Sequence, residues 1–469
     1  MANEEVEKHD QEHMLSAVPT SERRPTWKQV MVWVGFGYVV TGMFVGGVLA
    51  GFGDQPGLPP GMAFLAIVLG MGLLAILTVL LGIVAQKTGL NLALISRYSY
   101  GSLGSNLPLA VMALLTLGWF ASITGMVGQI WGSFIGSPTG ITVFNPAIIG
   151  YDHIPPISLE NFLSCVIFGF IFTITAYFGI KAIEAVAIPV SPVILMIALI
   201  VGIGMLREGG GIGSFMSEAN QLGGLGLGHA ITVVTGSWIA GVVMGVDFFR
   251  FNKNVKGVIA GAIACFVLTN PLLNIVGYIG AVQVGQFNYV DWMVQKGILL
   301  AIIGVIAWTT SLWTTNNAEL YCNSLYAGPV LSSLKKPVKR KNIVLFTGIL
   351  GTIIGSMAFY EMFFDDFITV LGAAFLPLAG PIIADYYLVK KRNYNVDQLN
   401  DQPKYRMAGI VTFSIGAILG LIFQYILPLP YGLPAGIVAL FITIVIYPFI
   451  YNMTDKNHDI ALDKKAAGA

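Results

Sequence analysis

Charged residues are rare and widely spaced along this chain, and the long apolar stretches between them restrict it to a membrane fold. Only 10% of its 469 residues are charged and 55% are hydrophobic, whereas about a quarter of the residues in an average soluble domain are charged. A helix needs roughly 20 apolar residues to cross the hydrocarbon core of a bilayer. The spacing predicts an all-α integral membrane protein with twelve transmembrane helices, at 32–53, 61–86, 106–136, 161–180, 185–206, 228–246, 257–281, 297–318, 342–360, 367–384, 407–426 and 435–452.

The basic residues predict the orientation of these helices. Twelve spans place both termini on one side of the membrane, and all 25 Lys and Arg residues except Arg207 and Lys296 then fall on that side. Because cytoplasmic loops carry an excess of Lys and Arg, we expect a multi-pass protein of the plasma membrane with both termini cytoplasmic. Residues 1–26 lack the apolar core of a signal peptide, so they and residues 453–469 are expected to be cytoplasmic tails. The net charge is only +1 and the basic residues are spread through short loops, so nucleic acid is not indicated as a partner. No obligatory protein partner is indicated either.

A short motif recurs at a constant offset. The tetrapeptide Val-Val-Thr-Gly at 39–42 returns 194 residues later at 233–236, and the same offset relates Trp119 to Trp313. Transporters are often built from two inverted repeats whose first helices are broken near mid-membrane. The offset predicts two five-helix repeats and an appended helix pair, at 27–210, 211–390 and 391–452.

Glycine is frequent in the first helix of each predicted repeat, which favours a break in both helices. The alternative is close helix packing through small residues four apart, such as Gly42 and Gly46 in one helix and Gly241 and Gly245 in the other. Both interpretations stay open. The polar stretches at 87–104 and 286–296 are expected to form short interfacial helices or turns.

The acidic residues indicate what kind of solute could cross. Asp247, Glu319, Glu361 and Asp385 are all expected at the ends of spans, where burial of a charge costs less than at the centre. We therefore expect a small uncharged solute. Asp247 and Arg250, three residues apart, are interpreted as a structural clamp or gate.

Aromatic and amide side chains lie where a solute would bind. Trp119 and Trp238 fall well inside their predicted spans, and two facing indoles can sandwich a planar ring at roughly 1–3 kcal/mol per stacking contact. Asn316 offers a donor and an acceptor side by side, which suits the edge of a pyrimidine or purine. The alternative for a membrane Trp is interfacial anchoring or packing, and Trp313 is interpreted as packing.

Three hydroxyl-rich positions indicate a cation site. Ser311, Thr314 and Thr315 lie at i, i+3 and i+4, hence on one face of a helix. Together with the freed carbonyls of a broken first helix, they would form an oxygen cage for a hard monovalent cation such as sodium. The alternative is that the hydroxyls bond back to carbonyls of their own helix.

Four motifs together resemble those of a known family. They are Gly118-Trp119-Phe120, the stretch Asp247-Phe248-Phe249-Arg250-Phe251, Trp313-Thr314-Thr315-Asn316 with Leu320-Tyr321 after it, and Ile382-Ile383-Ala384-Asp385-Tyr386. From about residue 30 to 450 the chain is similar to the nucleobase cation symporters, and within them to the bacterial cytosine permeases. The resemblance implies a LeuT-like 5+5 inverted-repeat fold, alternating access, and sodium-coupled uptake of a nucleobase.

The resemblance also implies roles for residues of a substrate site. Trp119 and Trp238 would stack the base, while Ser237 and Asn316 would hydrogen-bond its edge. Thr116 stands where cytosine permeases usually carry Gln, and the aromatic residue of helix 6 is Trp rather than Phe, as in hydantoin-type members.

For sodium, the resemblance implies a second set of residues. The ion would be held by the carbonyls of Gly35 and Tyr38, by an oxygen of Ser311, and by the hydroxyls of Thr314 and Thr315. Ser311 departs from the Asn that is usual in cytosine permeases.

Several alternatives remain open. The substrate could be another neutral heterocycle, such as a purine, a hydantoin or a vitamin-precursor pyrimidine, or less readily an amino acid, whose carboxylate needs a free half-helix N-terminus. Coupling to protons through Glu319 also remains open. An enzyme is not expected, because the five histidines and three cysteines show no catalytic or metal-ligand spacing.

Overall fold

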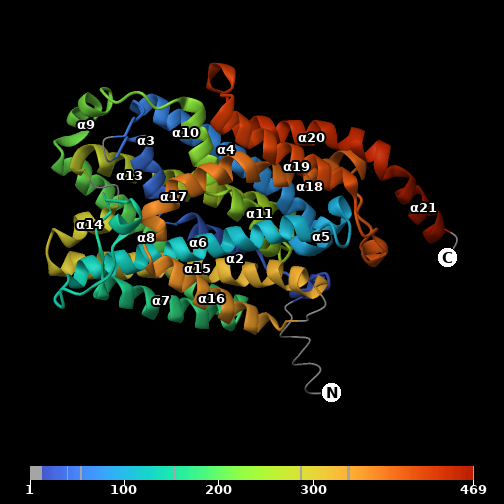
Figure 1. The fold of residues 1–469 in the computed structure, drawn as a ribbon, viewed down its shortest axis with the longest axis horizontal. Coiled ribbons are helices and arrows are strands. Elements are labelled where there is room, and N and C mark those ends of the chain that lie inside the picture. The colour runs from blue at the N-terminus through green and yellow to red at the C-terminus, as the bar shows by residue number, and fades with distance from the viewer. Residues whose placement is uncertain are drawn as a thin grey trace.

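The structure is a computed structural model that describes residues 13–39, 41–52, 55–152, 154–285, 288–334 and 338–467. Val40 of the first tetrapeptide, positions 286–287 of the second polar stretch and the outer parts of both predicted tails, 1–12 and 468–469, lie outside the described residues. The molecule is a bundle of long helices that run roughly along its longest axis (Figure 1).

Each predicted span corresponds to a helix or to a pair of helical segments. The long elements are α2 (Thr26–Gly37) and α3 (Thr41–Leu49), α4 (Pro60–Thr88), α6 (Asn106–Ile135), α7 (Leu159–Tyr177), α8 (Ile180–Glu208), α10 (Leu227–Gly236) and α11 (Ile239–Phe249), α12 (Val255–Ile263) and α13 (Asn270–Val284), α15 (Ile298–Ser333), α16 (Arg340–Ser356), α17 (Phe359–Val370) and α18 (Ala379–Ala384), α19 (Met407–Leu421) and α20 (Ala435–Thr454). Short π-helical and 3-10 segments continue several of them, at η3 (Ala264–Thr269), η4 (Leu371–Phe375), η5 (Leu376–Leu378), η6 (Asp385–Val389) and η8 (Ile422–Ile426).

The connecting elements are short. They are η1 (Thr20–Glu22), α5 (Leu92–Tyr100), the antiparallel pair β1 (Thr142–Phe144) and β2 (Ile157–Ser158), η2 (Pro146–Ile149), α9 (Gly211–Ala219), α14 (Tyr289–Val294), η7 (Val396–Asp401), η9 (Pro430–Gly432) and α21 (Lys456–Ala467). The helices α5 and α14 confirm the short helices expected at 87–104 and 286–296.

The chain is a multi-pass membrane protein. Among the described residues, nine helical segments are long and apolar enough to cross a bilayer on their own, or eleven if each bent pair counts as one span. The first bent pair joins Thr26–Gly37 to Gly42–Leu49 at 46°, and the second joins Pro192–Glu208 to Gly211–Ala219 at 80°. The predicted span at 342–360 corresponds to α16, whose 17 residues are at the short end of the spanning range. The total of twelve spans stays a prediction.

Two spans are broken where the sequence predicted. One break follows α2 at Tyr38 and Val39, and the other separates α10 from α11 at Ser237 and Trp238, where Trp238 has φ −136° and ψ 0°. The alternative of close packing also holds: a Cβ at Gly46 would overlap the carbonyl of Asn274. Both interpretations of the glycine-rich helices are therefore correct.

Helix 8 differs from its prediction. The span expected at 297–318 is α15, which continues to Ser333 and is 36 residues long. Glu319 therefore lies inside the helix, close to its central residues Thr315 and Asn316, and the expectation that it marks a helix end was wrong. The prediction ended the span at the first charged residue, but this carboxyl group is buried in protein rather than placed in lipid.

The boundary between the ninth and tenth spans was also misplaced. Glu361, Asp365 and Asp366 were expected to separate them, but these residues belong to α17. The chain turns just before α17, at Met357 and Ala358, where Ala358 adopts the left-handed conformation with φ 61°.

The described chain begins and ends at one end of the bundle, beside α5 and α21, which we call the terminal end (Figure 1). The helices α9 and α14 lie at the opposite end (Figure 1). The prediction that the terminal end faces the cytoplasm is consistent with this arrangement and stays a prediction.

Candidate functional site

Trp119 lies buried on α6 with 4% of its surface exposed. Its indole packs edge-on against Phe364 and Phe367, at ring-centroid distances of 5.4 and 5.6 Å. Gly118 makes this arrangement possible, because a Cβ there would lie 2.8 Å from the Phe367 ring. Among the described residues, the indole nitrogen Nε1 of Trp119 has no hydrogen-bond partner.

Trp238 lies at the break between α10 and α11, with 7% of its surface exposed. It packs edge-on against Phe266 at 5.5 Å, and its Nε1 also has no hydrogen-bond partner among the described residues. Gly241 leaves room for the indole, because a Cβ at this position would overlap the ring. Among the described ring contacts none joins Trp119 to Trp238, and the sandwich of a planar solute between the two indoles stays a prediction.

Asn316 is held by the neighbouring helix α6. Its Nδ2 donates to the carbonyl of Phe120 at 3.3 Å and to the hydroxyl of Thr124 at 3.0 Å, and the residue is fully buried. No described residue donates a hydrogen bond to its Oδ1. Since buried polar groups in proteins are nearly always paired, a free acceptor beside the broken helices marks a position where a ligand can bind.

The other two predicted substrate residues are already engaged. The Ser237 hydroxyl donates to the carbonyl of Val234 at 2.8 Å, so only its lone pairs are free. The Thr116 hydroxyl donates to the carbonyl of Met112 at 2.8 Å and accepts from Asn323 Nδ2 at 3.0 Å. Thr116 therefore joins α6 to α15.

Asn323 was not identified from the sequence. It lies seven residues after Asn316, on the same helix face, and this spacing would have shown the pair if the end of helix 8 had been placed correctly. Trp313 donates to the Thr175 hydroxyl at 3.1 Å, in agreement with its interpretation as packing.

The predicted cation ligands lie where α15 meets the break in helix 1. The Ser311 hydroxyl donates to the carbonyl of Tyr38 at 2.6 Å, and the Thr314 hydroxyl donates to the carbonyl of Ser311 at 2.7 Å. The Thr315 hydroxyl is buried and has no hydrogen-bond partner within the part of the chain that the structure describes. Gly35 is buried one turn earlier on α2. Carbonyl and hydroxyl oxygens of this kind suit a hard cation. The Thr314 hydroxyl is already hydrogen-bonded within its own helix, whereas the Thr315 hydroxyl is not.

Asp247 of α11 and Arg250, at the C-terminal cap of this helix, hydrogen-bond to neighbouring elements. Asp247 accepts from the backbone of Leu92 at 3.1 Å and from the Tyr326 hydroxyl at 2.6 Å. Arg250 donates to the Tyr321 hydroxyl at 3.3 Å and to the carbonyl of His13 at 2.8 Å. Asp247 and Arg250 thus join α11 to α5, α15 and the N-terminal segment, as the interpretation of a structural clamp predicts.

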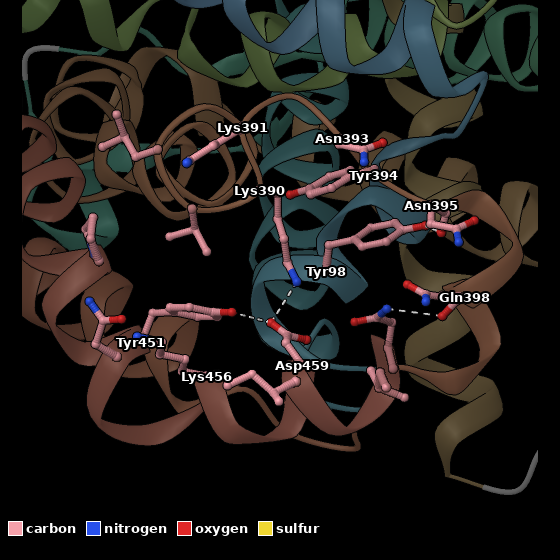
Figure 2. A pocket seen from close by; sticks show the side chains of 17 residues that line it. Tyr98, Lys390, Lys391, Asn393, Tyr394, Asn395, Gln398, Tyr451, Lys456 and Asp459 are labelled. Atoms are coloured by element: carbon pink, nitrogen blue, oxygen red, sulfur yellow. Dashed lines mark hydrogen bonds and ion pairs between the residues drawn. The ribbon is translucent and has the colours of Figure 1, made fainter. Parts of the chain in front are cut away.

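A separate cavity of about 670 Å³ lies at the terminal end, between α5, the segment after α18 and α21 (Figure 2). Asp459 of α21 accepts hydrogen bonds there from Lys390 at 2.7 Å, from Tyr451 at 2.6 Å and from Arg406 (Figure 2 shows the first two). Burial alone would raise the pKa of Asp459, but the hydrogen bonds and charge of Arg406 outweigh burial and hold the pKa well below its ordinary value. None of the predicted substrate or sodium residues lines this cavity. It lies where α21 packs against the rest of the bundle.

The breaks in the first and sixth spans, within a bundle of long apolar helices, fit the LeuT-like fold. Two solved structures agree. Mhp1, described as a nucleobase-cation-symport-1 family transporter in a closed conformation with bromovinylhydantoin bound, is 22% identical and covers 94% of this chain and 95% of its own, with a TM-score of 0.74. A Na+-coupled sialic acid symporter, 12% identical, covers 92% of this chain and 90% of its own, with a TM-score of 0.57.

Sequence comparison identifies the family. Residues 17–441 match the family described as permease for cytosine/purines, uracil, thiamine, allantoin, and the chain belongs to this family. The cytosine permease of Escherichia coli (strain K12) is 29% identical over 405 residues, which cover 86% of this chain and 87% of that permease. The protein is therefore a secondary transporter of nucleobase-like substrates and not an enzyme, and it is a member of the nucleobase cation symporters.

Proposed function

We propose that this protein imports cytosine or a related planar nucleobase across the plasma membrane together with sodium, by alternating access. The observation that carries the substrate part is a set of buried polar atoms that lack a hydrogen-bond partner among the described residues: Trp238 Nε1 at the break in helix 6, Trp119 Nε1 on α6, and Asn316 Oδ1 where α15 packs against α6. A planar heterocycle would stack on the indoles and accept or donate hydrogen bonds at its edge. Each stacking contact would contribute roughly 1–3 kcal/mol.

Edge contacts supply the selectivity that stacking lacks. The Asn316 amide is fixed by Phe120 and Thr124, so its free oxygen points in one direction. A ligand without a donor at this position would leave a buried acceptor unpaired, at a cost of about 1–3 kcal/mol. Ser237 offers a further acceptor at the helix break.

The sodium proposal rests on the contact between α15 and the first broken helix. Bound sodium would supply the free energy of its gradient to drive uptake. The Tyr38 carbonyl belongs to the predicted repeat 27–210, and the hydroxyls of Ser311, Thr314 and Thr315 belong to the predicted repeat 211–390. An ion held between them would stabilise one relative position of the two repeats, which is how ion binding can bias alternating access.

One alternative has an observation in its favour. Glu319 is a buried carboxyl group near the middle of α15, so the same fold could couple uptake to protons. Intramembrane carboxylates often serve as proton relays. Proton-coupled symport is therefore the second candidate.

The test is uptake of labelled heterocycles by purified protein in proteoliposomes, with and without an inward sodium gradient. We expect sodium-dependent uptake of a nucleobase, strongly reduced in Trp119→Ala and Trp238→Ala. Trp27→Ala is the matched control, because Trp27 is 58% exposed at the terminal end of α2. Uptake of amino acids alone would refute the substrate proposal, and sodium-independent uptake that follows a proton gradient would favour the alternative.

A further inference from the structure

Glu319 is a buried ionisable group to which sodium-coupled symport gives no role. It is 6% exposed, it lies four residues from Thr315 and three from Asn316 on α15, and its Oε2 has no hydrogen-bond partner in the described part of the chain. Within the described residues no ion pair involves this carboxyl group. A carboxyl group in the interior of a membrane protein is costly to maintain, so it indicates a functional role with a specific partner.

The helix geometry places Glu319 between the two predicted sites. Residues of an α-helix are separated by about 100°, so the directions of Ser311 and Asn316 differ by about 140° and Glu319 lies between them, about 60° from Asn316. Ser311 contacts Tyr38 at the break of helix 1, and Asn316 contacts Phe120 on α6. The Glu319 side chain therefore leaves α15 toward the space between helix 1 and α6.

The antiparallel contact of α15 with α6 shows which part of α6 lies level with Glu319. Asn316 bonds to Phe120 and Thr124, and Asn323 bonds to the carbonyl of Ala113 at 2.7 Å, so Glu319 lies between the two. This is the level of α6 that carries Trp119. Glu319 is thus at the level of Trp119 along α6, about 4.5 Å along the axis of α15 from Asn316.

Glu319 adds a second unpaired acceptor to this flank of α15. Among the described residues, Asn316 Oδ1 and Glu319 Oε2 both lack a hydrogen-bond partner, and they lie one turn apart on one helix. Asp247, which lies toward the terminal end, already accepts from Leu92 and Tyr326. A ligand that presents adjacent N–H donors would supply the partners that the Glu319 carboxyl group lacks.

We propose that Glu319 is a substrate-binding residue that selects heterocycles with two adjacent N–H donors on one edge, such as the N1–H and 2-amino group of guanine. A carboxylate has four lone-pair positions and can accept from both donors at once, and hydrogen bonds to a charged acceptor are the stronger kind. Neutral cytosine offers a donor next to an acceptor, so it would use only part of this capacity. The inference rests on the proposed function, because it assumes that a nucleobase-like ring binds beside Trp119.

Guanine and hypoxanthine form a matched pair for the test, because hypoxanthine lacks only the 2-amino group. Initial uptake of each labelled base is measured in proteoliposomes with wild-type protein, Glu319→Gln and the control Glu361→Gln. Glu361 is also a carboxyl residue with an unpartnered Oε2, but it lies in the first turn of α17. We expect the wild type and Glu361→Gln to take up guanine at least tenfold more efficiently than hypoxanthine, and Glu319→Gln to reduce this ratio to about two or less.

The ratio does not depend on how much protein is folded, and the hypoxanthine uptake of Glu319→Gln shows that this variant is active. A guanine preference that persists in Glu319→Gln would overturn the inference, as would a wild type that transports other heterocycles without preferring guanine. An unchanged ratio with a lost response to a proton gradient would overturn it in favour of a proton-carrying Glu319. If the wild type transports no heterocycle, the proposed function fails, and this inference fails with it.

Discussion

Thr315→Val is the most direct perturbation of the proposed sodium site. The Thr315 hydroxyl is buried and unpartnered, whereas the hydroxyls of Ser311 and Thr314 each donate to a backbone carbonyl. Valine keeps the branched shape and removes only the oxygen. Loss of one contact to a charged group costs roughly 1.5–3 kcal/mol, and at about 1.4 kcal/mol per tenfold this raises the half-saturating sodium concentration roughly 10- to 150-fold.

Thr315→Val should weaken sodium binding but should not lower the stability of the protein. Since the hydroxyl makes no hydrogen bond in the structure, its replacement by a methyl group removes an unsatisfied buried polar atom, and the melting temperature should stay the same or rise. A loss of sodium affinity without a loss of stability separates an ion ligand from a packing residue.

The assay is initial uptake in proteoliposomes as a function of external sodium, with choline replacing sodium to keep the ionic strength constant. Thr310→Val is the matched control, because the Thr310 hydroxyl on the same helix donates to the carbonyl of Ile306 at 2.8 Å. The control should keep the wild-type sodium curve. If Thr315→Val keeps it too, or if wild-type uptake does not depend on sodium, the proposed cage is wrong.

Three further predictions concern neighbouring positions. Gly241→Ala should displace the Trp238 indole and lower the affinity for planar solutes about tenfold or more, measured by quenching of tryptophan fluorescence, because the added Cβ overlaps the ring. Thr116→Val should lower the free energy of unfolding by about 1–3 kcal/mol in a thermal melt but leave the ranking of substrates unchanged, because it leaves Asn323 Nδ2 without one of its acceptors. Asp459→Asn should increase hydrogen exchange in α21. Because the pKa of Asp459 is depressed, its contribution is present above the ordinary value of 3.8 and is lost only as the pH falls below it, so the difference between variant and wild type should be constant from about pH 5 to pH 8.

The sequence predicted the membrane-spanning helices best, because lipid surrounds them. A helix in lipid must satisfy its own backbone and keep charges out, so the distance between charges predicted a helix for every span. The repeat offset and the glycines also predicted that helices 1 and 6 are broken, and the structure separates α2 from α3 and α10 from α11. Pairings between helices were not predictable. The contact of Ser311 with Tyr38 joins positions 273 residues apart, and the sequence implied it only through resemblance.

The same rule that predicted the spans led to the error at Glu319. Charge spacing treats every position of a helix as if it faced lipid, but α15 lies between other helices, and a residue there is surrounded by protein. A carboxyl group in such a position does not end a helix; it requires a partner, and within the described residues its Oε2 has none. The expectation of an uncharged solute depended on the absence of such a group. The role proposed for Glu319, one turn from Asn316, makes the site suited to a base that presents adjacent N–H donors, and the ratio of guanine to hypoxanthine uptake tests this role.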